Sequence, residues 1–183
     1  REVPSFRTTP ESSDLYPMLK SMLAAGCSEA VMEVSSHGIH QSRVHGLNLE
    51  ISVFLNLSRD HLDYHPDMER YFCEKRKIFN GENGILPKVA VINADCPYGK
   101  RLIAELPPQV RVLTFGTTDM CDFRAREIEI GETESSFILD SPAGTHVVSS
   151  PMIGSFNVLN LLASLAVIYA KGRSVPDTLR KVG

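Results

Sequence analysis

Residues 31–37 read Val-Met-Glu-Val-Ser-Ser-His, and residues 51–65 read Ile-Ser-Val-Phe-Leu-Asn-Leu-Ser-Arg-Asp-His-Leu-Asp-Tyr-His. Each stretch begins with apolar residues and ends with polar ones, a pattern that predicts a buried strand followed by polar groups at its carboxyl end. In open α/β sheets, ligands bind at the carboxyl ends of the strands. The two stretches therefore predict a site that contains Glu33, Asp60 and His61. The carboxylate oxygens of Glu33 and Asp60 suit a hard divalent cation such as Mg²⁺.

The segment from Asp67 to Phe79 has an acidic start and a basic end, as a helix prefers. At helical spacing, Lys75 lies on the same face as Phe72 and Phe79. A lysine among apolar residues either extends its amine to solvent or must be paired or neutralised. Desolvation lowers the pKa of an amine and makes it nucleophilic. Two interpretations stay open: a packed lysine paired with an acidic residue, or an amine that captures CO₂ as a carbamate and becomes an anionic metal ligand.

Apolar and polar segments alternate at strand and helix periods as far as Phe115. This alternation predicts an α/β fold with a mainly parallel, doubly wound sheet. Thr9 is expected to cap a first helix that ends near Gly26. Residues 123–150 have a period of two and predict a small antiparallel β extension. The other expected elements are strands at 89–93 and 110–115, a helix at 95–106 capped by Asp95, a long helix from Phe156 to Gly172 and a short last helix at 174–181.

Composition excludes several function classes. The chain has 183 residues and a net charge of −3, which gives no strong attraction to nucleic acid. No apolar run is long enough to span a membrane. The four cysteines are far apart in sequence, which is typical of reduced thiols in a cytosolic protein. Five histidines between residues 37 and 65 lack the spacing of a zinc cage.

Four motifs resemble the Mur ligases of peptidoglycan synthesis. They are Glu-Val-Ser-Ser-His at 33–37, Asn-Leu-Ser-Arg-Asp-His-Leu-Asp-Tyr-His at 56–65, Thr-Thr-Pro-Glu-Ser at 8–12, and Gly-x-Phe-Asn-x-x-Asn at 154–160. The resemblance is closest to the branch that adds the third residue of the peptide, and it is weakest between about Pro97 and Ser149. It implies the central domain of that family, which is similar to the P-loop NTPases in fold.

The resemblance also implies roles for individual residues. The implied metal ligands and catalytic groups are Glu33, His61 and Lys75, with the lysine carbamylated and the metal Mg²⁺. The implied contacts to the UDP-sugar peptide are Thr8, Thr9, Ser35, Gln41 and Arg43. Asn157 and Asn160 are implied to lie near the base of ATP. Structural alternatives stay open, because Thr9 can also cap a helix and the two asparagines can also serve the start of the last long helix.

The activity that the resemblance implies is ATP-dependent amide-bond formation. An acyl phosphate forms on UDP-MurNAc-L-Ala-D-Glu, and a diamino acid then displaces the phosphate. The sequence contains no Gly-x-x-x-x-Gly-Lys-Ser/Thr loop. We therefore expect residues 1–183 to be a partial central domain that lacks the P-loop, the N-terminal uridine-binding domain and the C-terminal domain. We expect it to be monomeric, cytoplasmic and inactive alone. The alternatives are a related ligase such as folylpolyglutamate synthetase, or a non-catalytic remnant that binds a nucleotide sugar.

Overall fold

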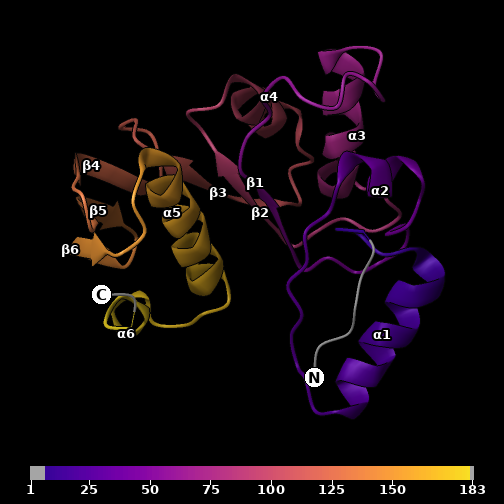
Figure 1. Cartoon of the computed structure of the whole chain (residues 1–183), viewed down its shortest axis with the longest axis horizontal. Helices are drawn as coiled ribbons and strands as arrows, with labels where there is room; N and C mark the ends of the chain where they lie inside the picture. The colour runs from indigo at the N-terminus through magenta and orange to yellow at the C-terminus, as the bar shows by residue number, and fades with distance from the viewer. Residues whose placement is uncertain (1–6, 182–183) are drawn as a thin grey trace. The chain divides into compact units, whose positions relative to one another are not determined.

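The structure is a computed structural model that describes residues 7–181. It contains two compact units, drawn in Figure 1. The described residues of Arg1–Leu49 and Arg59–Leu86 form the first, which we call the motif unit because it contains the motifs at 8–12 and 33–37 and most of that at 56–65. Those of Glu50–Ser58 and Pro87–Gly183 form the second, which we call the sheet unit.

The sheet unit is built on one six-stranded sheet whose strand order follows the chain. Its strands are β1 (Ile51–Phe54), β2 (Val89–Asn93), β3 (Arg111–Gly116), β4 (Phe123–Ile130), β5 (Ser135–Ser141) and β6 (Gly144–Ser150). Neighbouring strands from β1 to β4 are parallel, and β5 and β6 continue the sheet in antiparallel pairing. The predicted parallel sheet and antiparallel extension are therefore confirmed. The extension prolongs the sheet itself.

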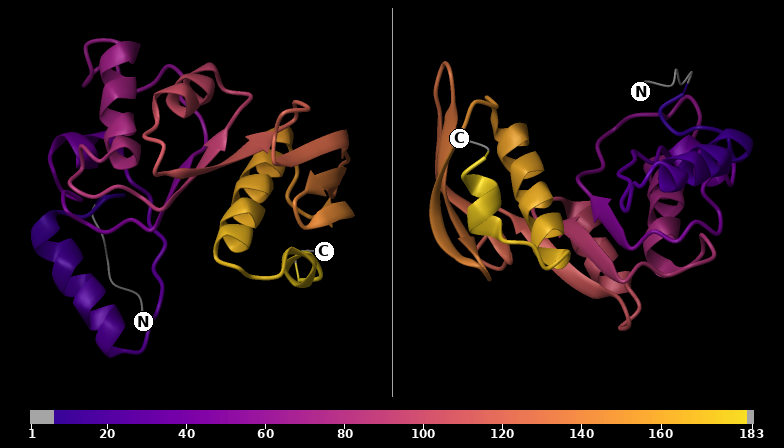
Figure 2. Two further views of the ribbon diagram at one scale, coloured as in Figure 1. Left: turned by 180° about the vertical axis from the view of Figure 1, so that it is seen from behind. Right: turned by 90° about the horizontal axis from the view of Figure 1, so that it is seen from below.

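Helices cover both faces of this sheet. All five residues of β2 are buried, including Val91 on one face and Ile92 on the other. Val91 belongs to the core cluster beneath α5 (Ser155–Ala170), which packs on β1 to β4. Ile92 faces α4 (Pro97–Glu105), where an added Cβ at Gly99 would lie 3.3 Å from its side chain. The short helix α6 (Val175–Leu179) packs with α5 on the same side of the sheet, as Figure 2 shows.

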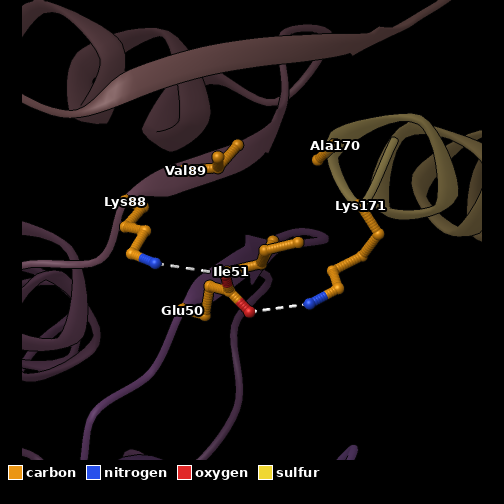
Figure 3. A pocket seen from close by; sticks show the side chains of 6 residues that line it. All are labelled: Glu50, Ile51, Lys88, Val89, Ala170 and Lys171. Atoms are coloured by element: carbon orange, nitrogen blue, oxygen red, sulfur yellow. Dashed lines mark hydrogen bonds and ion pairs between the residues drawn. The ribbon is translucent and has the colours of Figure 1, made fainter. Parts of the chain in front are cut away.

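A small pocket lies where β1 and β2 begin and α5 ends. Its volume is about 170 Å³. The carboxylate of Glu50 lies 3.3 Å from Lys88 Nζ and 2.7 Å from Lys171 Nζ (Figure 3). Hydrogen bonds from Lys171 and Lys88 lower the pKa of Glu50. This pocket is at the amino ends of the strands, opposite the end where parallel sheets bind ligands.

The motif unit contains three helices and, among its described residues, no strand. They are α1 (Ser12–Ala24), α2 (Ser36–His40) and α3 (Met68–Asn80). The prediction of a buried strand that ends at Glu33 is wrong, because residues 27–35 form neither helix nor strand and Val31 is 98% exposed. An apolar run becomes a strand only when a neighbouring strand accepts its backbone hydrogen bonds. No ladder in the described part of the chain includes this segment.

Two predicted helix caps are also wrong. The N-cap position of α1 is Glu11, and the Thr9 hydroxyl bonds to a different segment. The N-cap position of α4 is Cys96, whereas the Asp95 carboxylate accepts hydrogen bonds from the loop after β3, including one of 2.7 Å from the backbone N of Thr117. The side chains of Thr9 and Asp95 both form hydrogen bonds with residues distant in sequence, and rules for local capping consider only near neighbours. None of the helices within residues 7–181 combines the length and the apolar character that crossing a membrane requires.

Candidate functional site

Thr9 connects the predicted substrate-binding residues at 8–12 with the segment at 33–35. Its side chain is buried, with 1% of the residue surface exposed. The hydroxyl donates to the backbone oxygen of Glu33 at 3.1 Å and accepts from the backbone N of Ser35 at 2.9 Å. Ser35 Oγ lies 3.2 Å from the same hydroxyl and caps α2 by accepting from Gly38 N at 3.0 Å. The segments at 8–12 and 33–37 are thus joined directly.

Arg43 is buried beside Thr9. Only 4% of its surface is exposed, and its Nη1 donates to the backbone oxygen of Thr9 at 2.8 Å. Its Nη2 donates to Gln41 and lies 3.2 Å from a carboxylate oxygen of Glu11. Its Nε is buried and has no hydrogen-bond partner among the described residues. The structure therefore brings Thr9, Ser35, Gln41 and Arg43 together, and Thr8 lies exposed next to them.

Tyr64 links α2 to the motif that follows β1. Its hydroxyl lies 2.7 Å from His40 Nδ1 and accepts from Gln41 Nε2 at 3.4 Å. Its ring centroid lies 3.8 Å from that of His37. Burial lowers the pKa of His37, and the nearby His61 lowers it further. A set of aromatic and imidazole rings therefore packs beside the predicted substrate loop.

His65 lies behind these rings in the interior of the motif unit. It is 3% exposed, and its Nε2 lies 2.9 Å from Ser36 Oγ. Its ring stacks on that of Tyr71 from α3, with the centroids 5.1 Å apart. Burial lowers the pKa of His65. The residue thereby connects the start of α2 with one face of α3.

His61, a predicted metal ligand, has a left-handed backbone with a φ of 55°. Residues with a Cβ seldom adopt this conformation, which is often found at functional positions. The backbone N donates to its neighbour Asp60 at 2.7 Å. Its ring lies edge-on to His37, 5.1 Å away, and to Tyr71, 5.7 Å away. These contacts orient the imidazole without a helix or strand at that residue.

Lys75 and Glu33 interact electrostatically, although 42 positions (75 − 33) separate them in sequence. The Lys75 amine lies 5.9 Å from the centre of the Tyr71 ring, one helical turn earlier in α3. Desolvation by burial lowers the pKa of Lys75, and the negative charge of Glu33 partly opposes this shift. The lowered pKa supports both interpretations of this lysine, because each requires a shielded amine near a carboxylate.

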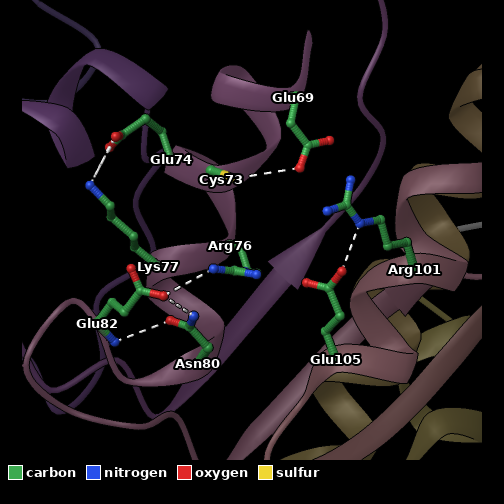
Figure 4. Close-up of polar contacts among 9 residues, drawn as sticks. All are labelled: Glu69, Cys73, Glu74, Arg76, Lys77, Asn80, Glu82, Arg101 and Glu105. Carbon is green, nitrogen blue, oxygen red and sulfur yellow. Dashed lines mark hydrogen bonds and ion pairs between the residues drawn. The ribbon is translucent and has the colours of Figure 1, made fainter.

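Lys77 provides the contrast on the same helix. Its amine forms an ordinary ion pair with Glu74 at 2.8 Å, as Figure 4 shows.

The helix α3 begins where the Asp67 carboxylate accepts from Arg70 N at 2.7 Å, and it ends at Gly81 with a φ of 89°. The predicted helix at 67–79 is confirmed to within one residue.

The donor groups can be compared with what Mg²⁺ requires. Within residues 7–181, no three His, Cys, Asp or Glu side chains are arranged to hold a metal ion. Glu33 supplies exposed carboxylate oxygens, and a carbamate on Lys75 would supply two more. The chemistry of this donor set fits a hard cation if the lysine is modified.

The two predicted ATP contacts are in the sheet unit. Asn157 Nδ2 donates to the backbone oxygen of Ile153 at 2.9 Å, before the start of α5. Gly154, with a φ of 111°, occupies the N-cap position of that helix. Asn160 is exposed. The Asn157 contact matches the structural alternative, whereas a role near ATP stays a prediction for both asparagines.

Several residues of the motif unit were not singled out from the sequence. Tyr71 contacts His61, His65 and the amine of Lys75. Its spacing of four positions before Lys75 places it on the same helix face, and this signal was available in the sequence. The ion pair between Glu11 and Arg43 gave no such signal, because it joins two segments that are distant in the sequence.

Comparisons with known proteins assign this α/β domain to a class. Residues 3–168 match the family model described as the Mur ligase middle domain. The chain belongs to the Mur ligase family, and its match is to the middle domain of that family. The resemblance is therefore confirmed over residues 3–168.

Individual relatives refine this assignment. A UDP-N-acetylmuramoyl-L-alanyl-D-glutamate–2,6-diaminopimelate ligase of Solibacter usitatus is 42% identical over 172 residues, which cover 94% of this chain and 34% of the relative. A solved structure of a ligase with the same name has a TM-score of 0.85 at 33% identity, covering 94% of this chain and 35% of that one. A mutant of L. casei FPGS, with a TM-score of 0.52 at 18% identity over 77% of this chain and 32% of that one, shows a shared fold alone. The chain thus spans about a third of the length of its relatives.

Proposed function

We propose that this chain is the middle domain of an ATP-dependent ligase that adds 2,6-diaminopimelate to UDP-MurNAc-L-Ala-D-Glu. The names of the relatives support both the substrate and the added amino acid. The observation that carries the proposal is the shielded amine of Lys75 in the field of Glu33, because a ligase of this kind needs concentrated negative charge to hold its metal. The complete ligase is proposed to be a cytoplasmic monomer.

The proposal assigns the remaining parts to a longer protein. Residues 1–183 correspond to a partial middle domain, and the phosphate-binding loop, the uridine-binding domain and the C-terminal domain belong to the rest of the ligase. The share of about a third of each relative supports this division. Activity is therefore a property of the complete ligase, and the chain alone is expected to be inactive.

In the proposed reaction, a carboxylate of the UDP-sugar peptide attacks the γ-phosphate of ATP and releases ADP. The amine of diaminopimelate then attacks the acyl carbon, and phosphate leaves. Transfer of this kind depends on positioning and on charge neutralisation. Thr8, Ser35, Gln41 and Arg43 are proposed to bind the anionic sugar substrate, and Asn157 and Asn160 the base of ATP.

Lys75 is proposed to act as a carbamate. The ammonium first loses a proton to solvent. The lone pair of Nζ then forms a bond to the carbon of CO₂ while one C=O π pair moves onto oxygen, and a second proton leaves the nitrogen for solvent. The side chain thus changes from cationic to anionic, and with Glu33 and His61 it would hold Mg²⁺. Bound there, Mg²⁺ would supply positive charge to the phosphate oxygens. Shielding by Tyr71 and by the helix face favours the unprotonated amine that CO₂ requires.

Chemical rescue in the complete ligase tests the proposal. Lys75→Ala should lower activity by about 100-fold or more, and acetate or formate should restore part of it. Lys77→Ala, which removes the lysine paired with Glu74, is the matched control and should keep near-normal activity. A ¹³C carbamate signal from ¹³C-bicarbonate should be present in the parent and absent in Lys75→Ala.

Other outcomes would contradict it. If Lys75→Ala retains near-normal activity, or if amines restore activity and acids do not, Lys75 is a packed lysine. A complete protein that binds the UDP-sugar peptide without forming an acyl phosphate would instead be a non-catalytic remnant. Activity on a folate and glutamate, with none on the UDP-sugar peptide, would favour a folylpolyglutamate synthetase.

A further inference from the structure

We propose that the side chain of Thr9 is a positioning residue for Glu33, and that its hydroxyl makes no contact with the sugar substrate. The inference rests on the proposed function, in which Glu33 is a metal ligand. It changes the role of Thr9 from a substrate contact to a clamp that sets where the Glu33 carboxylate lies.

The first support is the use of the hydroxyl. A threonine hydroxyl has one proton to donate and two lone pairs to accept. Thr9 donates to the backbone oxygen of Glu33 at 3.1 Å and accepts from the backbone N of Ser35 at 2.9 Å, and Ser35 Oγ lies 3.2 Å from the same hydroxyl. The two backbone groups flank a single residue, so the hydroxyl fixes the backbone on both sides of Val34. With 1% of Thr9 exposed, no solvent-facing surface remains for a ligand.

The second support is the lack of other regular structure at Glu33. Residues 27–35 belong to no helix or strand, and Glu33 itself is exposed. In a sheet, the ladder of backbone bonds would hold such a carboxylate in place. Among the described contacts, the Thr9 hydroxyl supplies backbone bonds at this position instead. Losing them should increase the freedom of the Glu33 carboxylate.

The third support is the fit of the methyl group. A Cβ added at Gly38 would lie 2.7 Å from Thr9 Cγ2 and 2.9 Å from Thr9 Cβ. The methyl group therefore occupies the space beside Gly38 and holds the side chain in one rotamer. Arg43 fixes the backbone of Thr9 by donating to the Thr9 backbone oxygen at 2.8 Å. The clamp is thus rigid at both its side chain and its backbone.

The test separates a positioning role from a substrate contact in the complete ligase. Thr9→Val keeps the shape and removes the hydroxyl, whereas Thr9→Ser keeps the hydroxyl and removes the methyl group. Mn²⁺ alone serves as the probe of the metal site, and its affinity is measured by electron paramagnetic resonance. The KM for the UDP-sugar peptide is measured alongside. Thr8→Val, at the exposed neighbour, is the matched control.

We expect Thr9→Val to weaken Mn²⁺ binding by about 10-fold or more, in the range found for groups that orient metal ligands. In Thr9→Val, the KM for the UDP-sugar peptide should change by less than about twofold. Thr9→Ser, which keeps the hydroxyl, should retain most of the Mn²⁺ affinity of the parent. Thr8→Val should instead raise the KM with little change in Mn²⁺ binding. Gly38→Ala, which pushes against Thr9 Cγ2, should weaken Mn²⁺ binding in the same direction as Thr9→Val.

The inference is overturned if Thr9→Val raises the KM and leaves Mn²⁺ binding unchanged, or if neither quantity changes. If Thr9→Val does not fold, as judged by circular dichroism, Thr9→Ser and Gly38→Ala decide the question, and unchanged Mn²⁺ affinity in Gly38→Ala counts against the clamp. Glu33→Gln distinguishes the metal role of Glu33 from the positioning role of Thr9. Mn²⁺ affinity that is unaffected by Glu33→Gln refutes the metal role of Glu33, whereas an effect of Glu33→Gln without one of Thr9→Val refutes only the clamp.

Discussion

The rings of His65 and Tyr71 are stacked, with 5.1 Å between their centroids and 10° between their planes. His65 also lies within hydrogen-bond distance of Ser36 at the start of α2. Tyr71 belongs to the same face of α3 as Lys75. Two short motifs are therefore held against one helix by a buried imidazole, and the protonation of that imidazole should influence the stability of the motif unit.

The stability of the chain should decrease in mild acid. Burial lowers the pKa of His65 below its ordinary value of 6.5, so the unfolded state binds a proton at a higher pH than the folded state does. The contribution is fully present above the unfolded pKa and is lost as the pH falls from 6.5 through the folded pKa. His65→Gln should reduce the difference in melting temperature between about pH 7.5 and about pH 5.5. A difference in melting temperature as large in His65→Gln as in the parent would contradict the assignment.

Gly99→Ala should destabilise the sheet unit. A Cβ at this position would lie 1.9 Å from the backbone oxygen of Asn93, so α4 must move away from β2. Overpacking of this kind costs about 2 kcal/mol or more. Urea denaturation measures the change in the free energy of unfolding. Lys100→Ala, at the exposed next residue, should have a small effect, and a Gly99→Ala variant as stable as the parent would show that the close approach of α4 is wrong.

Arg43→Ala should affect both folding and substrate binding. The variant leaves the Thr9 oxygen and the Gln41 side chain without their buried cationic partner, which should lower the free energy of unfolding by about 3 kcal/mol. In the complete ligase, the KM for the UDP-sugar peptide should rise more than the KM for ATP, because the guanidinium suits an anionic sugar substrate. A rise confined to ATP would exclude this role. Arg7→Ala, which also removes a partner of Glu11 but at an exposed site, is the control.

Asn157→Ala should separate the two interpretations of the start of α5. If its amide serves only the helix, the loss of the bond to Ile153 should reduce the free energy of unfolding by about 1 kcal/mol without changing the KM for ATP. If Asn157 instead lies near the base of ATP, as proposed, Asn157→Ala should raise the KM for ATP in the complete ligase. Asn160→Ala removes an exposed amide and should raise the KM for ATP with little effect on stability. Unchanged KM values in both variants would exclude the proposed contacts.

Local features of the sequence determined much of the sheet unit and α3. The predicted strand at 89–93 has the bounds of β2, because every side chain in it is apolar or lies at its end. The predicted helix at 67–79 corresponds to α3, since Asp67 caps one end and Gly81 terminates the other. The four motifs at 8–12, 33–37, 56–65 and 154–160 predicted the family, which the match over residues 3–168 confirms. These are properties of residues close together in the chain.

The tertiary structure alone decided how those residues are used. An apolar run around Val31 reads as a strand, yet strand formation depends on a neighbouring strand that the run does not specify. Thr9 reads as a helix cap, yet its hydroxyl bonds to Glu33, 24 positions away. Hydrogen bonds and electrostatic fields act across space, so a sequence identifies the groups that can make them, and only the folded chain selects the partners.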